Sequence, residues 1–438
     1  MDKEAFEELV SSVDKEGVAQ KVIDRDKKKF DDIIEEYKKE INAEPNNPEK
    51  YNSLGKVYYK LRRYNEAIHY FKQAIKVNTR FDEAYINLGN SHYKMEDYNL
   101  AIEVYEQALR ISPNDPDIYN NLGFAFIRKG QNIKAIDNYK KAININPHES
   151  DYLNNLGNIY YDTGQIDSAI EVYNKAIFEN PYKPDIYYNL AMGYYDKTLY
   201  DLAIESFEKC ISLDVHNYDA YFTLGLIYSQ MNENAKALEY YLKCLAIEPQ
   251  HHYSYTSIGF IYIKMGLSDK AIQAFNDAID IDPEQLMPYL NLGLIYDEKQ
   301  QYKKAINNYK KVLELNPRNA TAYSFLGVSY LKSNNFDEAI RCFNKAIEIE
   351  PYHSEAYYNL GIAYSIKDDF QTAEEYLTKA LAIDPEYLAA YLDLGLLFER
   401  QKKYIKAIDN YKRALQLDPD NKDADEGLKN IKEAMKNE

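Results

Sequence analysis

The segment Thr321–Pro351, TAYSFLGVSYLKSNNFDEAIRCFNKAIEIEP, contains a pattern that recurs along most of the chain. If a 34-residue block is counted from Ala320, its defining residues are Tyr323, Leu326, Gly327, Tyr330, Ala339, Phe343, Ala346 and Pro351, at positions 4, 7, 8, 11, 20, 24, 27 and 32. The block occurs eleven times without insertion or deletion, with Gly or Ala at position 8 and Ala at position 20 in every copy. A fixed period of this length predicts a repeat array.

At these residues, over 48–421, the sequence resembles the tetratricopeptide repeat (TPR) family. The resemblance implies an all-α, helix-turn-helix repeat solenoid, a TPR superhelix of about eleven 34-residue repeats with terminal capping helices. The apolar positions agree, because positions 3, 7, 10, 11 and 14 follow the 3.6-residue period of a helix. Each repeat would contact only its neighbours, so one continuous array is expected instead of several globular domains.

The predicted organisation has three parts. Residues 1–47 form an N-terminal arm and a degenerate half-repeat cap, whose second half, Phe30–Glu44, keeps helical spacing, while the first 13 residues are expected to fray or be disordered. Residues 422–438 form a C-terminal solvating helix. The TPR repeats lie between them, at 48–81, 82–115, 116–149, 150–183, 184–217, 218–251, 252–285, 286–319, 320–353, 354–387 and 388–421.

The turns of the repeat carry their own signals. Gly130, Gly164 and Gly266 at position 15 suit a left-handed cap at the end of the first helix. Asp269 and Asp337 at position 18 are predicted to cap the start of the second helix.

Charge and composition narrow the classes of partner. The net charge is −17 and the isoelectric point is near 5.0, which argues against binding to nucleic acid or to anionic membranes. The first 17 residues contain no apolar signal-peptide core, and no apolar run is long enough to span a membrane. A cytoplasmic location is therefore expected.

No pattern typical of an enzyme was found. The sequence has no phosphate-binding glycine-rich loop and no nucleophile elbow. The three cysteines show no pairing pattern, and His251–His252 has no ligand cluster beside it, so no disulfide framework, metal or cofactor is expected. The chain is predicted not to be an enzyme.

The candidate binding surface is the groove that the first helices would line. Position 6 is asparagine in six repeats, four of them consecutive: Asn87, Asn121, Asn155, Asn189, Asn291 and Asn359. A carboxamide offers a donor and an acceptor side by side, so one per repeat could hold the backbone of an extended peptide. This row resembles the asparagine ladder in the superhelical repeat region of O-linked N-acetylglucosamine transferases. The alternative is that these asparagines are solvated and ordinary for the family.

Basic side chains lie at the start of the same predicted groove. They are Lys56, Lys60, Lys94 and Arg128, and an acidic or phosphorylated segment would meet them there. The alternative is that they are solvated lysines that are common at this position. The family's carboxylate clamp uses basic and asparagine side chains at set positions in three successive repeats. Here position 5 of the first repeat is Asn52 and position 2 of the third is Asp117, so the clamp is not expected.

The later repeats place apolar residues at groove positions. These are Phe222, Leu226, Phe260, Leu290, Leu294 and Phe325. Exposed apolar stripes usually mark interaction surfaces, so an amphipathic helix, an apolar peptide or self-association is expected here. The alternative is that the winding of the array hides them.

The leading interpretation is a non-enzymatic scaffold that binds an extended or helical segment of another protein in its concave groove. One alternative is a substrate-targeting subunit or relative of the transferases' repeat region that lacks the catalytic domain. Another is a homo-oligomer that uses the apolar stripe between copies.

Overall fold

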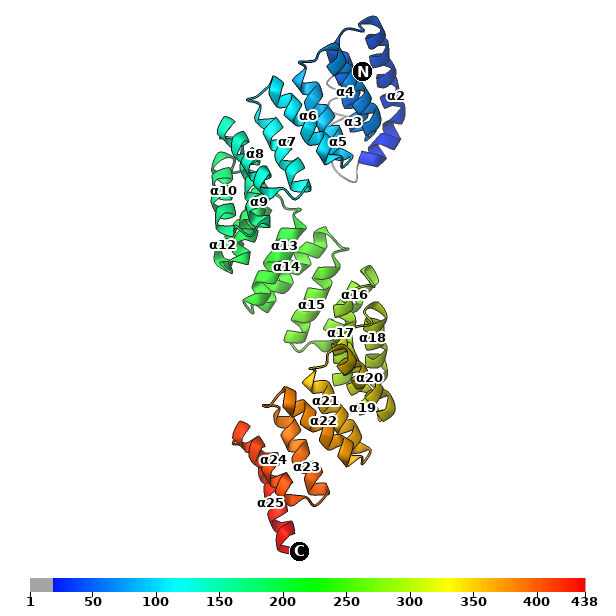
Figure 1. Ribbon diagram of the computed structural model, residues 1–438, viewed down its shortest axis with the longest axis vertical. Helices are drawn as coiled ribbons and strands as arrows, with labels where there is room; N and C mark the ends of the chain where they lie inside the picture. The colour runs from blue at the N-terminus through cyan, green and yellow to red at the C-terminus, as the bar shows by residue number, and fades with distance from the viewer. Residues whose placement is uncertain (1–18, 438) are drawn as a thin grey trace. The chain divides into compact units, whose positions relative to one another are not determined.

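The helices of the chain follow one another as antiparallel pairs (Figure 1). The computed structural model describes residues 19–437, and within them all regular secondary structure is helical, in 24 helices labelled α2 to α25. The predicted all-α repeat solenoid is confirmed. The expectation for the first 13 residues falls outside the described range.

Helix α2 spans Ala19–Ala43 and helix α25 spans Lys422–Asn437. Between them lie the pairs α3 (Pro48–Lys60) and α4 (Tyr64–Val77), α5 (Asp82–Lys94) and α6 (Tyr98–Ile111), α7 (Pro116–Arg128) and α8 (Asn132–Ile145), α9 (Ser150–Asp162) and α10 (Ile166–Glu179), α11 (Pro184–Asp196) and α12 (Tyr200–Leu213), α13 (Tyr218–Gln230) and α14 (Asn234–Ile247), α15 (His252–Lys264) and α16 (Ser268–Ile281), α17 (Leu286–Glu298) and α18 (Tyr302–Leu315), α19 (Ala320–Lys332) and α20 (Phe336–Ile349), α21 (Ser354–Ile366) and α22 (Phe370–Ile383), and α23 (Leu388–Arg400) and α24 (Tyr404–Leu417).

The turn inside each pair has one shared geometry. Position 15 has a positive φ in every pair, between 57° and 75°, at three glycines and at eight other residues. The left-handed cap predicted for Gly130, Gly164 and Gly266 is therefore confirmed. The other eight residues adopt the same conformation at a steric cost, because their β-carbon crowds the backbone there.

Thr198→Gly is expected to stabilise the chain by about 1 kcal/mol, because threonine is β-branched and holds a φ of 58°. The reverse change, Gly164→Thr, at a φ of 75°, should cost a similar amount. Urea unfolding of both variants measures the two changes. Equal midpoints for Thr198→Gly and the parent would contradict the expectation.

The predicted caps at position 18 are wrong. Helix α20 begins at Phe336, its cap residue Asn335 makes no side-chain cap bond, and Asp337 lies one residue inside the first turn. Asp337 instead accepts a hydrogen bond from Lys367 Nζ of the next pair at 2.7 Å, and Asp269 accepts one from Lys299 at 2.9 Å. The acidic side chains thus link neighbouring repeats.

The core is built from the small and aromatic positions of the repeat. The alanine at position 20 is fully buried in every pair, and the large residue at position 24 is at most 4% exposed. The position-8 glycine leaves room for that large residue. At Gly259, an added β-carbon would lie 2.5 Å from Cε1 of Phe275. The first and second helices of a pair therefore approach closely only because these positions are small.

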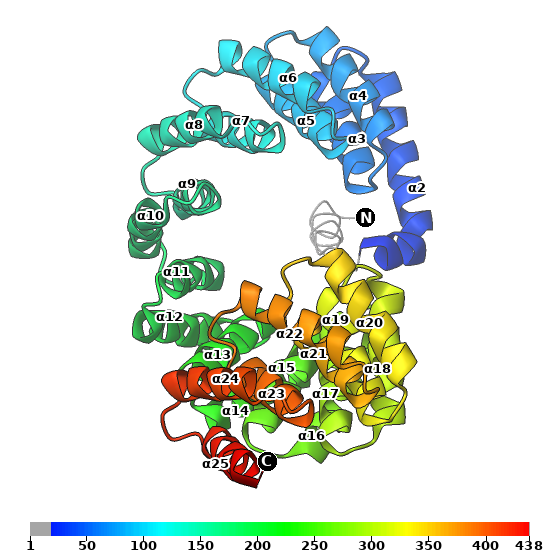
Figure 2. The ribbon, with the colours of Figure 1, turned by 60° about the horizontal axis from the view of Figure 1, so that its bottom comes forward.

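The described chain divides into two units, which meet in sequence between Ala220 and Tyr221. In the first unit, consecutive first helices touch one another, as α3, α5 and α7 do, and as α9 and α11 do. Figure 2 shows α7, α9 and α11 on the inner side of this unit and α8, α10 and α12 on its outer side. In the second unit, α17, α19, α21, α23 and α25 touch in the same successive way. First helices of neighbouring pairs therefore lie side by side along these stretches of each unit.

Candidate peptide-binding site

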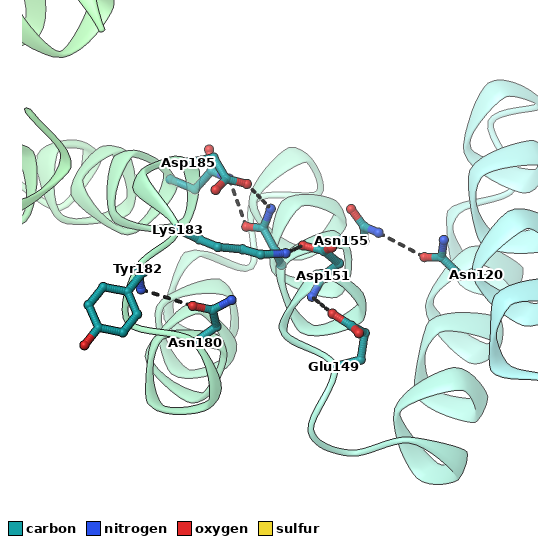
Figure 3. Close-up of polar contacts among 10 residues, drawn as sticks. Asn120, Glu149, Asp151, Asn155, Asn180, Tyr182, Lys183 and Asp185 are labelled. Carbon is teal, nitrogen blue, oxygen red and sulfur yellow. Dashed lines mark hydrogen bonds and ion pairs between the residues drawn. The ribbon is translucent and has the colours of Figure 1, made fainter. Parts of the chain in front are cut away.

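The four consecutive asparagines at position 6 each make one hydrogen bond to the preceding repeat, all within the first unit. Asn87, Asn121, Asn155 and Asn189 are called the asparagine ladder below. Each Nδ2 donates to an asparagine Oδ1 of the preceding repeat: Asn87 to Asn52 at 3.0 Å, Asn121 to Asn90 at 3.4 Å, Asn155 to Asn120 at 2.9 Å and Asn189 to Asn154 at 3.0 Å. Figure 3 shows the bond from Asn155 to Asn120 across the repeat boundary.

These bonds orient the ladder. One amide hydrogen of each ladder residue is used, while the second hydrogen and Oδ1 have no protein partner among the described residues. The ladder side chains are partly buried, so they are not freely solvated. The arrangement can offer one acceptor and one donor per repeat to a ligand.

The acceptors of these bonds were missed by the sequence reasoning. Asn52 and Asn154 at position 5 are only 3% and 7% exposed. Asn154 also donates to Asp185 Oδ2 at 3.3 Å, which fixes its orientation. The doubled asparagines Asn120–Asn121 and Asn154–Asn155 were the available signal, because the first of each pair holds the ladder residue of the next repeat.

The other two predicted asparagines do not join the ladder. Asn291 is 9% exposed and donates to the carbonyl of Met287 in its own helix at 2.8 Å. Asn359 is 8% exposed. Both belong to the second unit, whereas the four ladder residues belong to the first.

The four predicted basic residues have different surroundings. Lys56 pairs with Glu83, and Arg128 donates to the Tyr98 hydroxyl at 3.1 Å. Lys60 is partly buried. Lys94 lines a cavity of about 210 Å³ together with Asn121. Lys94 therefore lies beside Asn121 of the ladder in a shared cavity.

The predicted apolar groove residues are all half-buried. Phe222 packs on Tyr241 with ring centres 5.7 Å apart, Phe260 on Phe275 at 5.6 Å, and Phe325 on Tyr309 at 5.8 Å. Leu226, Leu290 and Leu294 are covered to a similar degree. The sequence allowed either an exposed apolar stripe or residues hidden by the winding of the array. The structure shows an intermediate case, a partly covered apolar face.

A buried carboxylate in the second unit was also missed. Asp297 is 9% exposed and accepts hydrogen bonds from Ser329 Oγ at 2.8 and 2.7 Å and from the Tyr309 hydroxyl at 3.1 Å. Burial raises the pKa of Asp297, while the two hydroxyl donors oppose the shift. Ser329 belongs to the next repeat, so this cluster joins two repeats.

Other chemistry is limited in the described residues. Among them, no group of three or more His, Cys, Asp or Glu side chains could hold a metal ion. None of the described helices is both long and apolar enough to cross a lipid bilayer. Cys210, Cys244 and Cys342 are buried free thiols, and burial raises the pKa of Cys342 to about 12.

The fold and the groove define a helical-repeat protein. The model of the cilia and flagella-associated protein 70 C-terminal domain, a TPR domain, matches residues 209–433, just over half of the chain. TPR models match residues 48–81, 89–130, 125–164, 157–197 and 184–215. The chain belongs to the tetratricopeptide repeat family.

Solved structures of other repeat proteins are similar over parts of the chain. The crystal structure of MamA protein is 32% identical, covers 39% of this chain and 92% of its own, and has a TM-score of 0.37. YrrB, described as a TPR protein with an unusual peptide-binding site, is 27% identical over 43% of this chain and 96% of its own, with a TM-score of 0.39. The crystal structure of the APC/C hetero-tetramer Cut9-Hcn1 contains a chain that is 15% identical. The match covers 92% of this chain and 93% of that chain, with a TM-score of 0.44. A comparison with curated protein sequences gives no match.

Proposed function

We propose that the protein is a non-enzymatic scaffold that binds an extended segment of another protein along the face of its first helices. The observation that carries the proposal is the asparagine ladder, in which four carboxamides are oriented in series by the preceding repeats. Groups that are already ordered lose little conformational entropy when a ligand binds. Membership of the TPR family supports the proposal, since TPR domains generally mediate contacts between proteins.

In this proposal each unit has its own binding region, polar in the first unit and apolar in the second. The ladder would hold a peptide backbone with little regard to its side chains, because it presents an acceptor and a donor at each repeat. Phe222, Phe260 and Phe325 would contact apolar side chains of the same or another segment. The division into 1–47, 48–421 and 422–438 and the cytoplasmic location remain predictions.

A second candidate is a substrate-targeting role beside a glycosyltransferase on another chain. The observation that favours it is one asparagine per repeat in four consecutive repeats, which is the feature shared with the transferases' repeat region. A third candidate is self-association through the half-buried apolar face. A sedimentation mass well above 51.2 kDa would support that third role.

Affinity capture from the source cells with three baits tests the scaffold proposal. The ladder variant changes Asn87, Asn121, Asn155 and Asn189 to Ala. The control variant changes Asn174, Asn308, Asn344 and Asn410 to Ala, since each of these donates only to a carbonyl of its own second helix. Circular dichroism checks the fold of all three.

We expect partners that bind the parent and the control but are lost from the ladder variant. Each hydrogen bond to the ladder is worth about 1 kcal/mol, so losing four should weaken binding by roughly 100-fold or more. Identical partners on all three baits would overturn the role of the ladder.

A further inference from the structure

The second unit contains a groove that is lined by both apolar and acidic side chains. It has a volume of about 510 Å³ and lies among α21, α23, α24 and α25. Leu392 and Leu396 form apolar parts of its wall, and Leu396 is 42% exposed. Four carboxylates, from Asp393, Glu399, Asp423 and Glu426, also line it. This groove is called the acidic groove below.

Asp393 stands at position 6, where the ladder residues of the first unit are asparagines. Aspartate and asparagine have the same shape, but an ionised carboxylate only accepts hydrogen bonds, whereas a carboxamide also donates them. The Tyr358 hydroxyl donates to Asp393 Oδ2 at 2.7 Å, which holds the carboxylate in place. The change from amide to carboxylate therefore selects a ligand that donates.

The carboxylates of the acidic groove form no direct ion pair within the described part of the chain, although Arg400 lies near enough to act on Asp393 electrostatically. Glu399 accepts a hydrogen bond from the Tyr411 hydroxyl at 3.0 Å, and within residues 29–436 no ion pair involves any of the four. Burial raises the pKa of Asp393, while the hydrogen bond from Tyr358 and the charge of Arg400 oppose the shift. A cationic group that enters the acidic groove would stabilise the ionised form of the Asp393 carboxylate.

The geometry of the groove decides which kind of cation fits. The four carboxylates do not approach closely enough to hold a metal ion, since none of the described residues forms a metal-binding group. A lysine or arginine side chain differs from a metal ion, because its charged head can reach a carboxylate while its aliphatic stem lies along leucines. The groove offers both surfaces side by side.

We infer that the acidic groove binds arginine or lysine side chains of a basic, amphipathic segment from a partner protein. Complementarity of charge and of apolar surface selects this occupant. The inference rests on the proposed scaffold function and adds the chemical class of the partner at this end of the second unit. It also assigns Asp393 and Glu426 as the residues whose carboxylates recognise the positive charge of the ligand.

Fluorescence anisotropy with two labelled peptides tests the inference on the full chain at about 150 mM salt. One peptide is a fluorescein-labelled 12-residue sequence of Leu, Ala and Arg. Its twin carries citrulline, the neutral isostere of arginine, at every arginine. Binding of each peptide is measured to the parent, to Asp393→Asn with Glu426→Gln, and to a control, Asp280→Asn with Glu284→Gln. The control removes the same charge from exposed residues outside the groove.

We expect the arginine peptide to bind the parent at least tenfold more tightly than its citrulline twin. The groove variant should lose at least tenfold in affinity for the arginine peptide, and the control should stay within twofold of the parent. Equal binding of the two peptides would overturn the inference. Equal losses in the groove variant and the control would also overturn it, because they would indicate attraction to the overall charge of −17.

Two further measurements separate this inference from the scaffold proposal. The ladder variant should bind the arginine peptide as the parent does, since its changes lie in the other unit. Suppose the affinity for the arginine peptide does not change in the groove variant, while affinity capture of partners still depends on the ladder. Then the assignment of the acidic groove fails and the scaffold proposal stands. Sedimentation tests the other occupant, a second copy of this chain. A dimer that is lost in the groove variant would overturn the assignment to a basic partner.

Discussion

Phe275→Ala is expected to destabilise the chain by about 3–5 kcal/mol, the range measured for removing a fully buried aromatic ring. Phe275 is 0% exposed in α16, and its ring covers Gly259 and meets Phe260 edge to face with centres 5.6 Å apart. Losing the ring leaves a cavity in the place where two helices of one pair meet. Urea unfolding measures the loss, and amide hydrogen exchange in α15 and α16 locates it.

Two comparisons make this expectation sharp. Phe178→Ala removes the same side chain from an 84% exposed site and should stay within about 0.5 kcal/mol of the parent. Gly259→Ala should cost about 1–3 kcal/mol alone, because its β-carbon meets the ring of Phe275. In the Phe275→Ala background that cost should largely vanish. Additive costs in the double variant would contradict the packing described for this pair.

Ser329→Ala is expected to cost about 1–3 kcal/mol at neutral pH, since it leaves the buried carboxylate of Asp297 with one hydroxyl donor fewer. Burial raises the folded pKa of Asp297 above its unfolded value. The stability tied to that proton is therefore present below the unfolded pKa and is lost as the pH rises through the folded pKa. Removing a donor raises the folded pKa further, so the cost of the substitution should shrink on acidification.

Ser91→Ala provides the matched control for this pH dependence. Ser91 occupies the same position 10 and is fully buried, and its hydroxyl donates to the carbonyl of Asn87 in its own helix at 2.8 Å. Ser329 makes the corresponding contact with the Phe325 carbonyl at 3.1 Å, but it also donates to Asp297. Ser91 makes no counterpart of that second bond among the described residues. Its substitution should cost a similar amount at every pH. Urea midpoints at pH 7 and pH 4 compare the two variants. A parallel response would show that Asp297 does not carry the effect.

The sequence predicts the repeat well because its register depends on contacts inside one period. The alanine at position 20, the glycine at position 8 and the large residue at position 24 pack on one another, so their spacing alone specifies the pair. The turn also depends only on local residues, and the left-handed conformation of Gly130 could therefore be predicted from the sequence. The caps predicted for Asp269 and Asp337 failed because both helices begin before these residues, and the two carboxylates accept hydrogen bonds from lysines one repeat later instead.

The site is less predictable because it depends on neighbouring repeats. A position-6 asparagine could be placed on the groove, but its orientation depends on Asn52 or Asn154 of the repeat before it. The apolar residues could be placed too, yet their half-burial follows from rings such as Tyr241. The acidic groove combines side chains from four helices, and the sequence shows only that Asp393 departs from asparagine.

The hydrogen bonds of the ladder all run the same way. Asn87, Asn121, Asn155 and Asn189 each donate backward, to the repeat that precedes them. A peptide strand is also directional, because its N–H and C=O groups succeed one another in a fixed order along the backbone. The two orientations of a bound strand are therefore inequivalent. This surface should favour one of them, so that the N-terminus of the bound segment always lies toward the same end of the ladder.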